Sequence, residues 1–160
     1  MKRIGLVTAA LATCVSVTGR AHAQDHAGMV LVPDNAAIHW QANPPGLPKG
    51  TEIAVLMGDP SKPGPFVLRV KFQANAIVPP HRHATAENLT ILSGEMFHSM
   101  GETLDQAHGD RLDPGGFVFL PPMMPHAVWA GSAGSVVQVT GTGPFGLIYV
   151  RRSDDPNPTP

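Results

Sequence analysis

Short apolar runs that end in turn-forming residues are the feature of this chain that most constrains its fold. The runs cover residues 53–57, 66–72, 89–92, 96–99, 117–120, 127–129, 136–140 and 147–150, and Gly, Pro, Asn, Asp or Ser stand at or near their ends. Runs this short are typical of β-strands, and no stretch after residue 24 keeps the apolar period of a helix. The sequence therefore predicts an all-β sandwich or barrel of roughly eight to ten strands.

The first 23 residues differ from the rest of the chain. Lys2 and Arg3 give a basic start, residues 4–17 are mostly apolar, and residues 21–23 read Ala-His-Ala, which supplies small residues for cleavage. This is the pattern of a secretory signal peptide. A permanent membrane helix would need about 20 apolar residues, and this run is shorter. We therefore expect a signal peptide over residues 1–23, a periplasmic or secreted protein, and no membrane association after cleavage.

Cys14 is the one cysteine of the sequence and lies within the expected signal. An alternative interpretation makes residues 11–14 a lipoprotein cleavage box, but Thr13 fits that box poorly. Cleavage of the signal would remove Cys14, so no disulfide can form and burial must stabilise the fold. The length suits one domain. We divide it into an N-terminal arm and strand (24–48), a β-barrel (49–152) and a flexible C-terminal tail (153–160).

The charge balance argues against one class of partner. Lys2, Arg3 and Arg20 are three of the 11 basic residues, so 8 basic and 12 acidic residues remain after cleavage. The remaining Lys and Arg residues are dispersed along the chain, whereas a nucleic-acid binder needs a basic stripe. We therefore expect no nucleic acid partner.

The most informative segment for chemistry is residues 78–94. Side chains two residues apart in a strand share a face, so His81 and His83 can converge on one ion, and Glu87 keeps the same parity. Leu89 and Ile91 continue that parity with apolar side chains. Polar residues fall on the opposite face, namely Arg82, Asn88 and Thr90. This pattern predicts a metal site near one mouth of a barrel.

A second segment, residues 115–126, supplies a further histidine. It reads as a strand, then a proline-rich corner, then His126. A chain that turns at this corner can bring His126 back toward His81 and His83. We therefore predict one divalent transition metal ion held by four side chains: His81, His83, Glu87 and His126.

These two segments resemble the two motifs of the cupin superfamily. The first motif reads Gly-x5-His-x-His-x3 or 4-Glu-x6-Gly, and its spacing is matched by His81, His83, Glu87 and Gly94. The second reads Gly-x5-Pro-x-Gly-x2-His-x3-Asn, and it is matched by Gly115, Pro121 and His126. Three positions depart from the motifs without removing a metal ligand: Asn75 and Met123 stand where glycines are expected, and Ala130 where Asn is expected.

The resemblance implies a single-domain, cupin-type jelly-roll β-barrel, usually a homodimer, with a mononuclear metal site. Residues 47–60 and 143–145 are in addition similar to small exported bacterial cupins and to the cupin part of anti-sigma factors. That similarity supports a sensing or binding role as the alternative to a metal-dependent enzyme, which is the first hypothesis.

The ligand set leaves the metal and the activity open. Three imidazoles and one carboxylate suit Fe, Mn, Zn, Ni or Cu. An octahedral ion would keep two adjacent positions for a small oxygen-rich substrate, alone or with dioxygen, which predicts a dioxygenase ahead of a decarboxylase or isomerase. The same four ligands would fill every coordination position of a tetrahedral zinc ion. That case predicts a non-catalytic metal- or ligand-sensing module. Glu87, if released from the metal, is the candidate catalytic base, with His98 and Glu102 as weaker ones.

Other residues have simpler interpretations. A lone histidine is more often solvated or hydrogen-bonded than a ligand, which applies to His26, His39, His98 and His108. Apolar side chains in the second segment and after it are expected to pack the barrel, namely Phe119, Met123, Met124 and Trp129, and Met123 or Trp129 can also line the pocket. Gln138 and Thr140 share parity on a late strand, and either register is compatible with the sequence.

Overall fold

The computed structural model describes residues 28–157, so the expected signal peptide over residues 1–23 lies outside the described residues. The described part is built from nine strands and two short 3₁₀ helices: η1 (Asn35–Ala37), β1 (Gln41–Ala42), β2 (Thr51–Met57), β3 (Gly64–Phe72), β4 (Ile77–Arg82), β5 (Glu87–Met100), β6 (Asp110–Leu112), β7 (Phe117–Leu120), β8 (His126–Gly143), β9 (Ile148–Tyr149) and η2 (Arg152–Asp154). The prediction of an all-β fold is confirmed.

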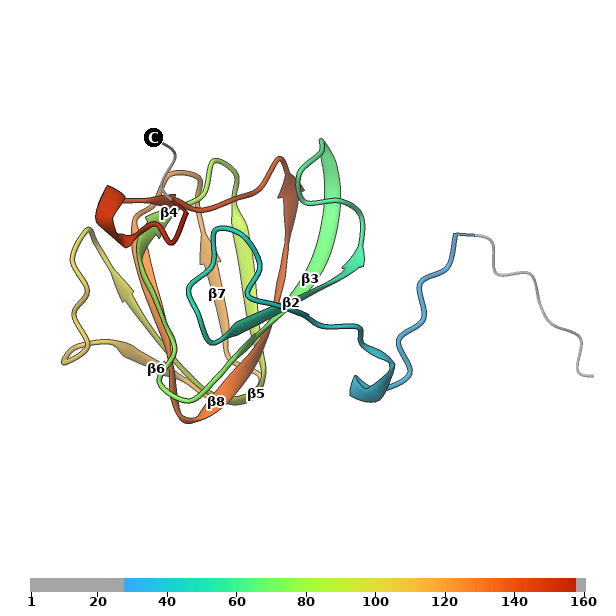
Figure 1. The fold of residues 1–160 in the computed structure, drawn as a ribbon, viewed down its shortest axis with the longest axis horizontal. Coiled ribbons are helices and arrows are strands. Elements are labelled where there is room, and N and C mark those ends of the chain that lie inside the picture. Colours follow the sequence, from blue (N-terminus) through green and yellow to red (C-terminus); the bar gives the residue numbers. More distant parts are fainter. Residues whose placement is uncertain (1–27, 158–160) are drawn as a thin grey trace, which may run out of the picture.

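All nine strands belong to one antiparallel sheet that curls on itself (Figure 1). The first part of β8 lies between β4 and the second part of β5, whereas the last part of β8 lies between β3 and the first part of β5. The two longest strands therefore pass through both layers. This sharing of long strands between two layers gives the jelly-roll arrangement.

Glycines allow β5 and β8 to bend where they pass between the layers. The register between the two strands shifts twice, once between Ile91 and Ser93 and once between Gly94 and Met96. Gly94 has φ +74°, and a Cβ there would lie 2.1 Å from the carbonyl oxygen of Gly134. Gly134 has φ +77°, and a Cβ there would lie 2.5 Å from the carbonyl oxygen of Phe72. Only glycine combines this backbone conformation with so close an approach of two chains.

One face of the curled sheet forms the core. Along β3 the side chains of Phe66, Leu68, Val70 and Phe72 are buried, while those between them are more exposed. The same alternation on the neighbouring strands contributes further buried residues, namely Leu89 and Ile91 of β5 and Val137 and Val139 of β8. Period-2 alternation on each strand thus places the apolar side chains on the inside.

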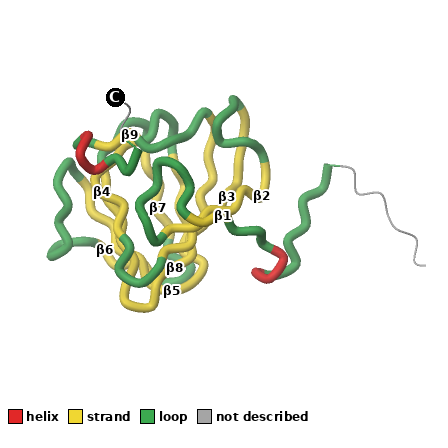
Figure 2. The backbone as a smooth tube through the Cα atoms, in the orientation of Figure 1, coloured by secondary structure: helices red, strands yellow, loops and turns green. Residues whose placement is uncertain are grey.

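The first described part of the N-terminal arm, residues 28–34, extends away from the barrel (Figure 2). Asp34 caps η1 by accepting hydrogen bonds from the backbone N–H groups of Ala36 and Ala37. The arm is anchored where it meets the sheet, because Lys71 lies 4.6 Å from the ring centroid of Trp40. Its first strand is β1, which pairs with β2.

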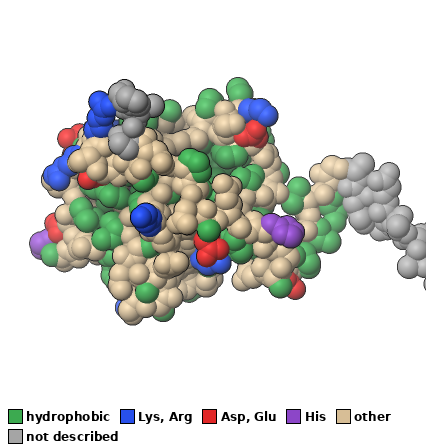
Figure 3. Space-filling model, viewed as in Figure 1, with side chains coloured by type: hydrophobic (Ala, Val, Ile, Leu, Met, Phe, Trp, Pro, Cys, Tyr) green, Lys and Arg blue, Asp and Glu red, His purple; other side chains and the backbone are tan. Residues whose placement is uncertain are grey.

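The described surface is mixed in charge. On the face shown in Figure 3, Lys and Arg side chains are scattered among Asp and Glu side chains. Across residues 28–157 no helix is long and apolar enough to pass through a bilayer.

Candidate metal centre

Three histidines from two adjacent strands meet at one end of the barrel. His81 of β4 is the register partner of His126, the first residue of β8, and His83 follows directly after β4. All three are buried, and each offers a nitrogen within 4.8 Å of the nitrogens of the other two. The structure thus brings together the three histidines that the motif spacing singled out.

Each of the three rings is held by the backbone through the same nitrogen, Nδ1. Each Nδ1 lies at hydrogen-bond distance from a carbonyl oxygen: His81 from Pro79 (2.8 Å), His83 from Gly146 (2.8 Å) and His126 from Met124 (3.2 Å). A carbonyl oxygen can only accept, so each neutral ring carries its proton on Nδ1. The Nε2 atoms are left with free lone pairs, which is the tautomer that a metal-ligating histidine needs.

Glu87, the first residue of β5, lies beside two of these histidines. Its Oε2 lies 3.3 Å from Nε2 of His83 and 3.4 Å from Nε2 of His126. The carboxylate is 4% exposed, and within the described part of the chain neither its Oε2 nor the His83 Nε2 has a hydrogen-bond partner. Donors bound to one transition ion at about 2.0–2.2 Å lie at comparable separations. The donor set therefore fits a metal ion.

The path from His83 to Glu87 differs from the one inferred by parity. We expected one face to continue through residues 81–91, and Leu89 and Ile91 are indeed buried on the side of Glu87. However, β4 ends at Arg82 and β5 begins at Glu87, so the intervening residues form a turn between strands. Glu87 reaches the histidines because β5 starts beside β8, where it pairs with Gly141.

Burial and mutual proximity set the protonation states. Burial, with the charges of His126 and His83 in addition, lowers the pKa of His81 to about 3. Burial by itself would raise the pKa of Glu87, but the imidazoles of His126 and His83 outweigh it and hold that pKa well below its usual range. At neutral pH the site therefore offers the neutral imidazole of His81 and the ionised carboxylate of Glu87, which favours a cation.

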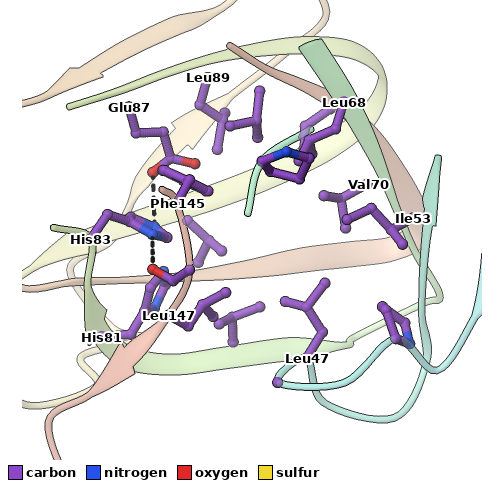
Figure 4. Close-up of a pocket in the computed structure, with 18 of the residues that line it drawn as sticks. Leu47, Ile53, Leu68, Val70, His81, His83, Glu87, Leu89, Phe145 and Leu147 are labelled. Atoms are coloured by element: carbon purple, nitrogen blue, oxygen red, sulfur yellow. Dashed lines mark hydrogen bonds and ion pairs between the residues drawn. The ribbon is translucent and has the colours of Figure 1, made fainter. Parts of the chain in front are cut away.

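A cavity of about 250 Å³ opens beside these four side chains. In Figure 4 Glu87, His83 and His81 lie on one side of it, and Leu68, Val70 and Ile53 lie across from them. Phe145 stacks on His83 with ring centroids 4.1 Å apart. The cavity leaves room for a small molecule next to the proposed metal position.

His98 lies closer to the histidine cluster than its sequence position indicated. We expected it to be solvated or hydrogen-bonded, but it is buried, and its Nε2 has no hydrogen-bond partner among the described residues. Its ring lies 5.6 Å from that of His126, and burial lowers its pKa. His98 stands two residues after buried Met96, so period-2 parity from Met96 could have indicated its position. The other weak base candidate, Glu102, is exposed and paired with Arg82.

Several expectations about packing were wrong. Phe119, Met123 and Met124 are exposed, with Phe119 at 56% and Met123 at 50%, and do not pack the barrel. Trp129 is buried but does not line the cavity. The open question about β8 is decided, because Val137 and Val139 line the cavity and Gln138 and Thr140 face the other way.

Two departures from the motifs have a backbone explanation. Asn75 has φ +59° and Met123 has φ +62°, so both adopt the left-handed conformation that favours glycine. Asn tolerates this region well, whereas it is strained for Met. The backbone N–H of Met123 donates to the carbonyl oxygen of His83 at 2.8 Å, which ties the corner to the site. Both positions therefore keep a left-handed backbone of the kind that glycine favours, although other residues occupy them.

Solved structures with this architecture are similar over most of the chain. The polyketide cyclase RemF from Streptomyces resistomycificus has a TM-score of 0.64 at 22% identity, covering 80% of this chain and 90% of that one. KdgF from Halomonas sp. has a TM-score of 0.52 at 21% identity, covering 68% and 89%. An RmlC-like cupin from Shewanella frigidimarina NCIMB 400 has a TM-score of 0.53 at 16% identity, covering 68% and 86%. At such identities the likeness shows the fold, a cupin-type jelly roll, as predicted.

Sequence comparison gives the family. No protein of curated function matches the chain. The ChrR cupin-like domain, in contrast, matches residues 29–146, which is most of the chain. The chain therefore belongs to the ChrR cupin-like domain family of the cupin superfamily.

Proposed function

We propose that this protein binds one divalent transition metal ion through His81, His83, His126 and Glu87. The observation that carries the proposal is the convergence of three buried imidazoles, whose Nδ1 atoms are already held by backbone carbonyls, with the Glu87 carboxylate beside two of them. Without an ion, the buried Oε2 of Glu87 and Nε2 of His83 remain unpaired, which is costly. Imidazole and carboxylate donors suit Fe, Mn, Zn, Ni or Cu.

The proposed activity is turnover of a small organic molecule in the adjoining cavity, with dioxygenation ahead of decarboxylation or isomerisation. A bound ion would supply Lewis acidity and a place for substrate oxygens to coordinate. The protein would orient the substrate against His83 and Phe145 and exclude water with its apolar wall. Glu87 is the proposed catalytic base when its carboxylate is free to accept a proton.

A non-catalytic role as a metal- or ligand-sensing module is the second candidate. One observation favours it: the only titratable side chains among the described residues that line the cavity are the four proposed ligands. A reaction that needs an acid or base other than a metal ligand would find no such side chain among these lining residues. Membership of the ChrR cupin-like family is compatible with both roles.

Metal analysis followed by an activity screen tests these proposals. The protein is purified without chelators, and its metal content is measured before and after loading with Fe, Mn or Zn. Oxygen uptake is then measured with diketones, flavonols and hydroxy acids. The double variant His81→Ala/His126→Ala should lose the metal, whereas His39→Ala/His108→Ala, which changes two exposed histidines, should keep it. Absence of bound metal after loading contradicts the metal centre, and ligand-dependent melting shifts without turnover favour sensing.

Export and self-association are further parts of the proposal. The composition of residues 1–23 supports a periplasmic or secreted location. The strand β7 pairs with β5 among the described residues and carries Phe117 and Phe119, which are both more than half exposed. Exposed aromatic side chains on a sheet edge support a homodimer as the assembled form.

A further inference from the structure

The wall of the cavity is apolar apart from the four proposed metal ligands. Its sides are formed by aliphatic residues of the curled sheet, among them Leu68, Val70, Leu89, Val137 and Val139. None of the described residues that line it is Lys, Arg, Ser, Thr, Asn, Gln or Tyr. A bound molecule therefore meets hydrogen-bonding or charged side chains at one end only.

Three cationic side chains stand next to lining residues in sequence, and each has an acidic or polar partner away from the cavity. Arg82, between His81 and His83, pairs with Glu102 and does not line the cavity. Arg69, between Leu68 and Val70, bonds to Oε1 of Gln138 at 3.3 Å and to Oδ1 of Asn35 at 3.1 Å. Lys71 is the next residue of β3 whose side chain points outward, and its Nζ forms an ion pair with Oε2 of Glu52 at 2.9 Å. Strand alternation fixes Arg69 and Lys71 on the outer face, so neither can neutralise an anionic group inside the cavity.

We propose that the ligand of this site is a mainly apolar molecule of one or two rings that carries a single chelating pair of oxygens at one edge, such as an aromatic 1,2-diol or an enolised diketone. This inference rests on the proposed metal centre. The oxygen pair would meet the ion, while the rings lie against Leu68 and Val70. A substrate with a second carboxylate or several hydroxyl groups would leave them desolvated and unpaired against the wall.

The size and the mouth of the cavity agree with such a ligand. Its volume of about 250 Å³ is slightly below the usual range of about 300–1,000 Å³ for small-molecule sites. Phe145 extends the aromatic surface of His83 at one side. The hydroxyl of Tyr149 donates to the carbonyl oxygen of Gly46 at 2.8 Å, which holds together two segments that border the cavity, near Leu47 and Leu147. The volume and the aromatic side chain at its edge are therefore compatible with a ligand of one or two rings.

A matched pair of valines on β3 provides the test. Val70 lines the cavity, whereas Val67 on the same strand faces the other way. The changes Val70→Thr and Val67→Thr each keep the side-chain volume and add one hydroxyl. Cobalt(II)-loaded wild type and variants are titrated with 2,3-dihydroxynaphthalene, 2-naphthol and oxalate, and dissociation constants are measured by calorimetry. The cobalt absorption bands, the metal content and the melting temperature are recorded on the same samples.

We expect 2,3-dihydroxynaphthalene to bind at least about tenfold more tightly than oxalate and to shift the cobalt bands, and 2-naphthol to bind more weakly. Val70→Thr should weaken binding of the diol roughly tenfold and leave oxalate unchanged, because a hydroxyl without a partner then faces the rings. Val67→Thr should change neither. Equal affinity for oxalate, or a Val70→Thr variant that binds the diol normally, overturns this inference while the metal centre stands. Failure of the wild type to take up metal contradicts the proposed function itself, and the inference falls with it.

Discussion

His81 and His126 are register partners on the antiparallel strands β4 and β8, and the centroids of their rings lie 4.2 Å apart. Backbone pairing of two strands therefore sets the spacing of the ligands. The Nδ1 hydrogen bonds to backbone carbonyls then set the direction of each ring. The site is consequently preorganised by the fold and does not need the ion for its assembly.

This preorganisation predicts that the fold survives metal removal but loses stability. A ligand that binds only the native state stabilises it by about 2.7 kcal/mol at a concentration of 100 times its dissociation constant. Adding the bound metal should therefore raise the melting temperature, and a chelator should reverse the rise while far-ultraviolet circular dichroism stays native. Loss of β structure on chelation would show that the ion is required for folding.

The role of the carboxylate is tested by Glu87→Gln, which keeps the shape and removes the charge. Because Glu87 is the only acidic donor in the group, we expect metal affinity to fall at least about tenfold, measured by competition with a coloured chelator. Glu102→Gln is the matched control, since Glu102 is exposed and lies outside the cavity. An unchanged affinity in Glu87→Gln would remove Glu87 from the ligand set.

Acid should destabilise the metal-free protein because of the histidine cluster. Burial and the charges of His126 and His83 lower the pKa of His81 to about 3, whereas its unfolded value is near 6.5. The unfolded chain therefore binds a proton that the native state refuses, and stability present above pH 6.5 is lost as the pH falls toward 3. Urea unfolding between pH 7 and pH 5 should show a loss of up to about 1.4 kcal/mol per pH unit for each such group. The slope should be smaller in His81→Gln, and a wild type with constant stability over this range contradicts the prediction.

The bend of β5 at Gly94 should tolerate no side chain. In Gly94→Ala the new Cβ would lie 2.1 Å from the Gly134 carbonyl oxygen, in addition to the cost of a positive φ. Gly101→Ala is the matched control, because Gly101 also has a positive φ but meets nothing within 4 Å. Each variant carries about 1 kcal/mol or more of backbone strain, so the excess loss of unfolding free energy in Gly94→Ala measures the close approach of β5 and β8. Equal losses of unfolding free energy in the two variants would show that β5 and β8 can move apart at Gly94 to make room for the methyl group.

Self-association through β7 is tested by Phe117→Glu/Phe119→Glu. Both side chains are exposed, so the charges should not disturb the core, and the dimer should dissociate in light scattering coupled to gel filtration. Leu104→Glu, which charges an exposed apolar residue of a loop, should leave the mass unchanged. A wild type that is monomeric at all concentrations removes the homodimer from the proposal.

The sequence by itself determined the strand-rich fold, the family and the grouping of His81, His83 and His126. These features depend on short-range patterns, because strand period and ligand spacing are written within a few residues. Period-2 alternation does not predict which side chains face inward when both faces of a strand are apolar. In β7 all four residues are apolar, so the pattern does not distinguish the inward Val118 and Leu120 from the outward Phe117 and Phe119.

The tertiary structure decided which residues surround the histidines. Whether Val137 and Val139 or Gln138 and Thr140 face the cavity depends on the register of β8 against β3 and β5, and a slip of one residue reverses the faces. The two register shifts between β5 and β8 are set by contacts such as that between Gly94 and Gly134, which lie far apart in sequence. The burial of His98 behind His126 and the apolar wall of the cavity follow from that long-range pairing, because no local pattern encodes which strands become neighbours.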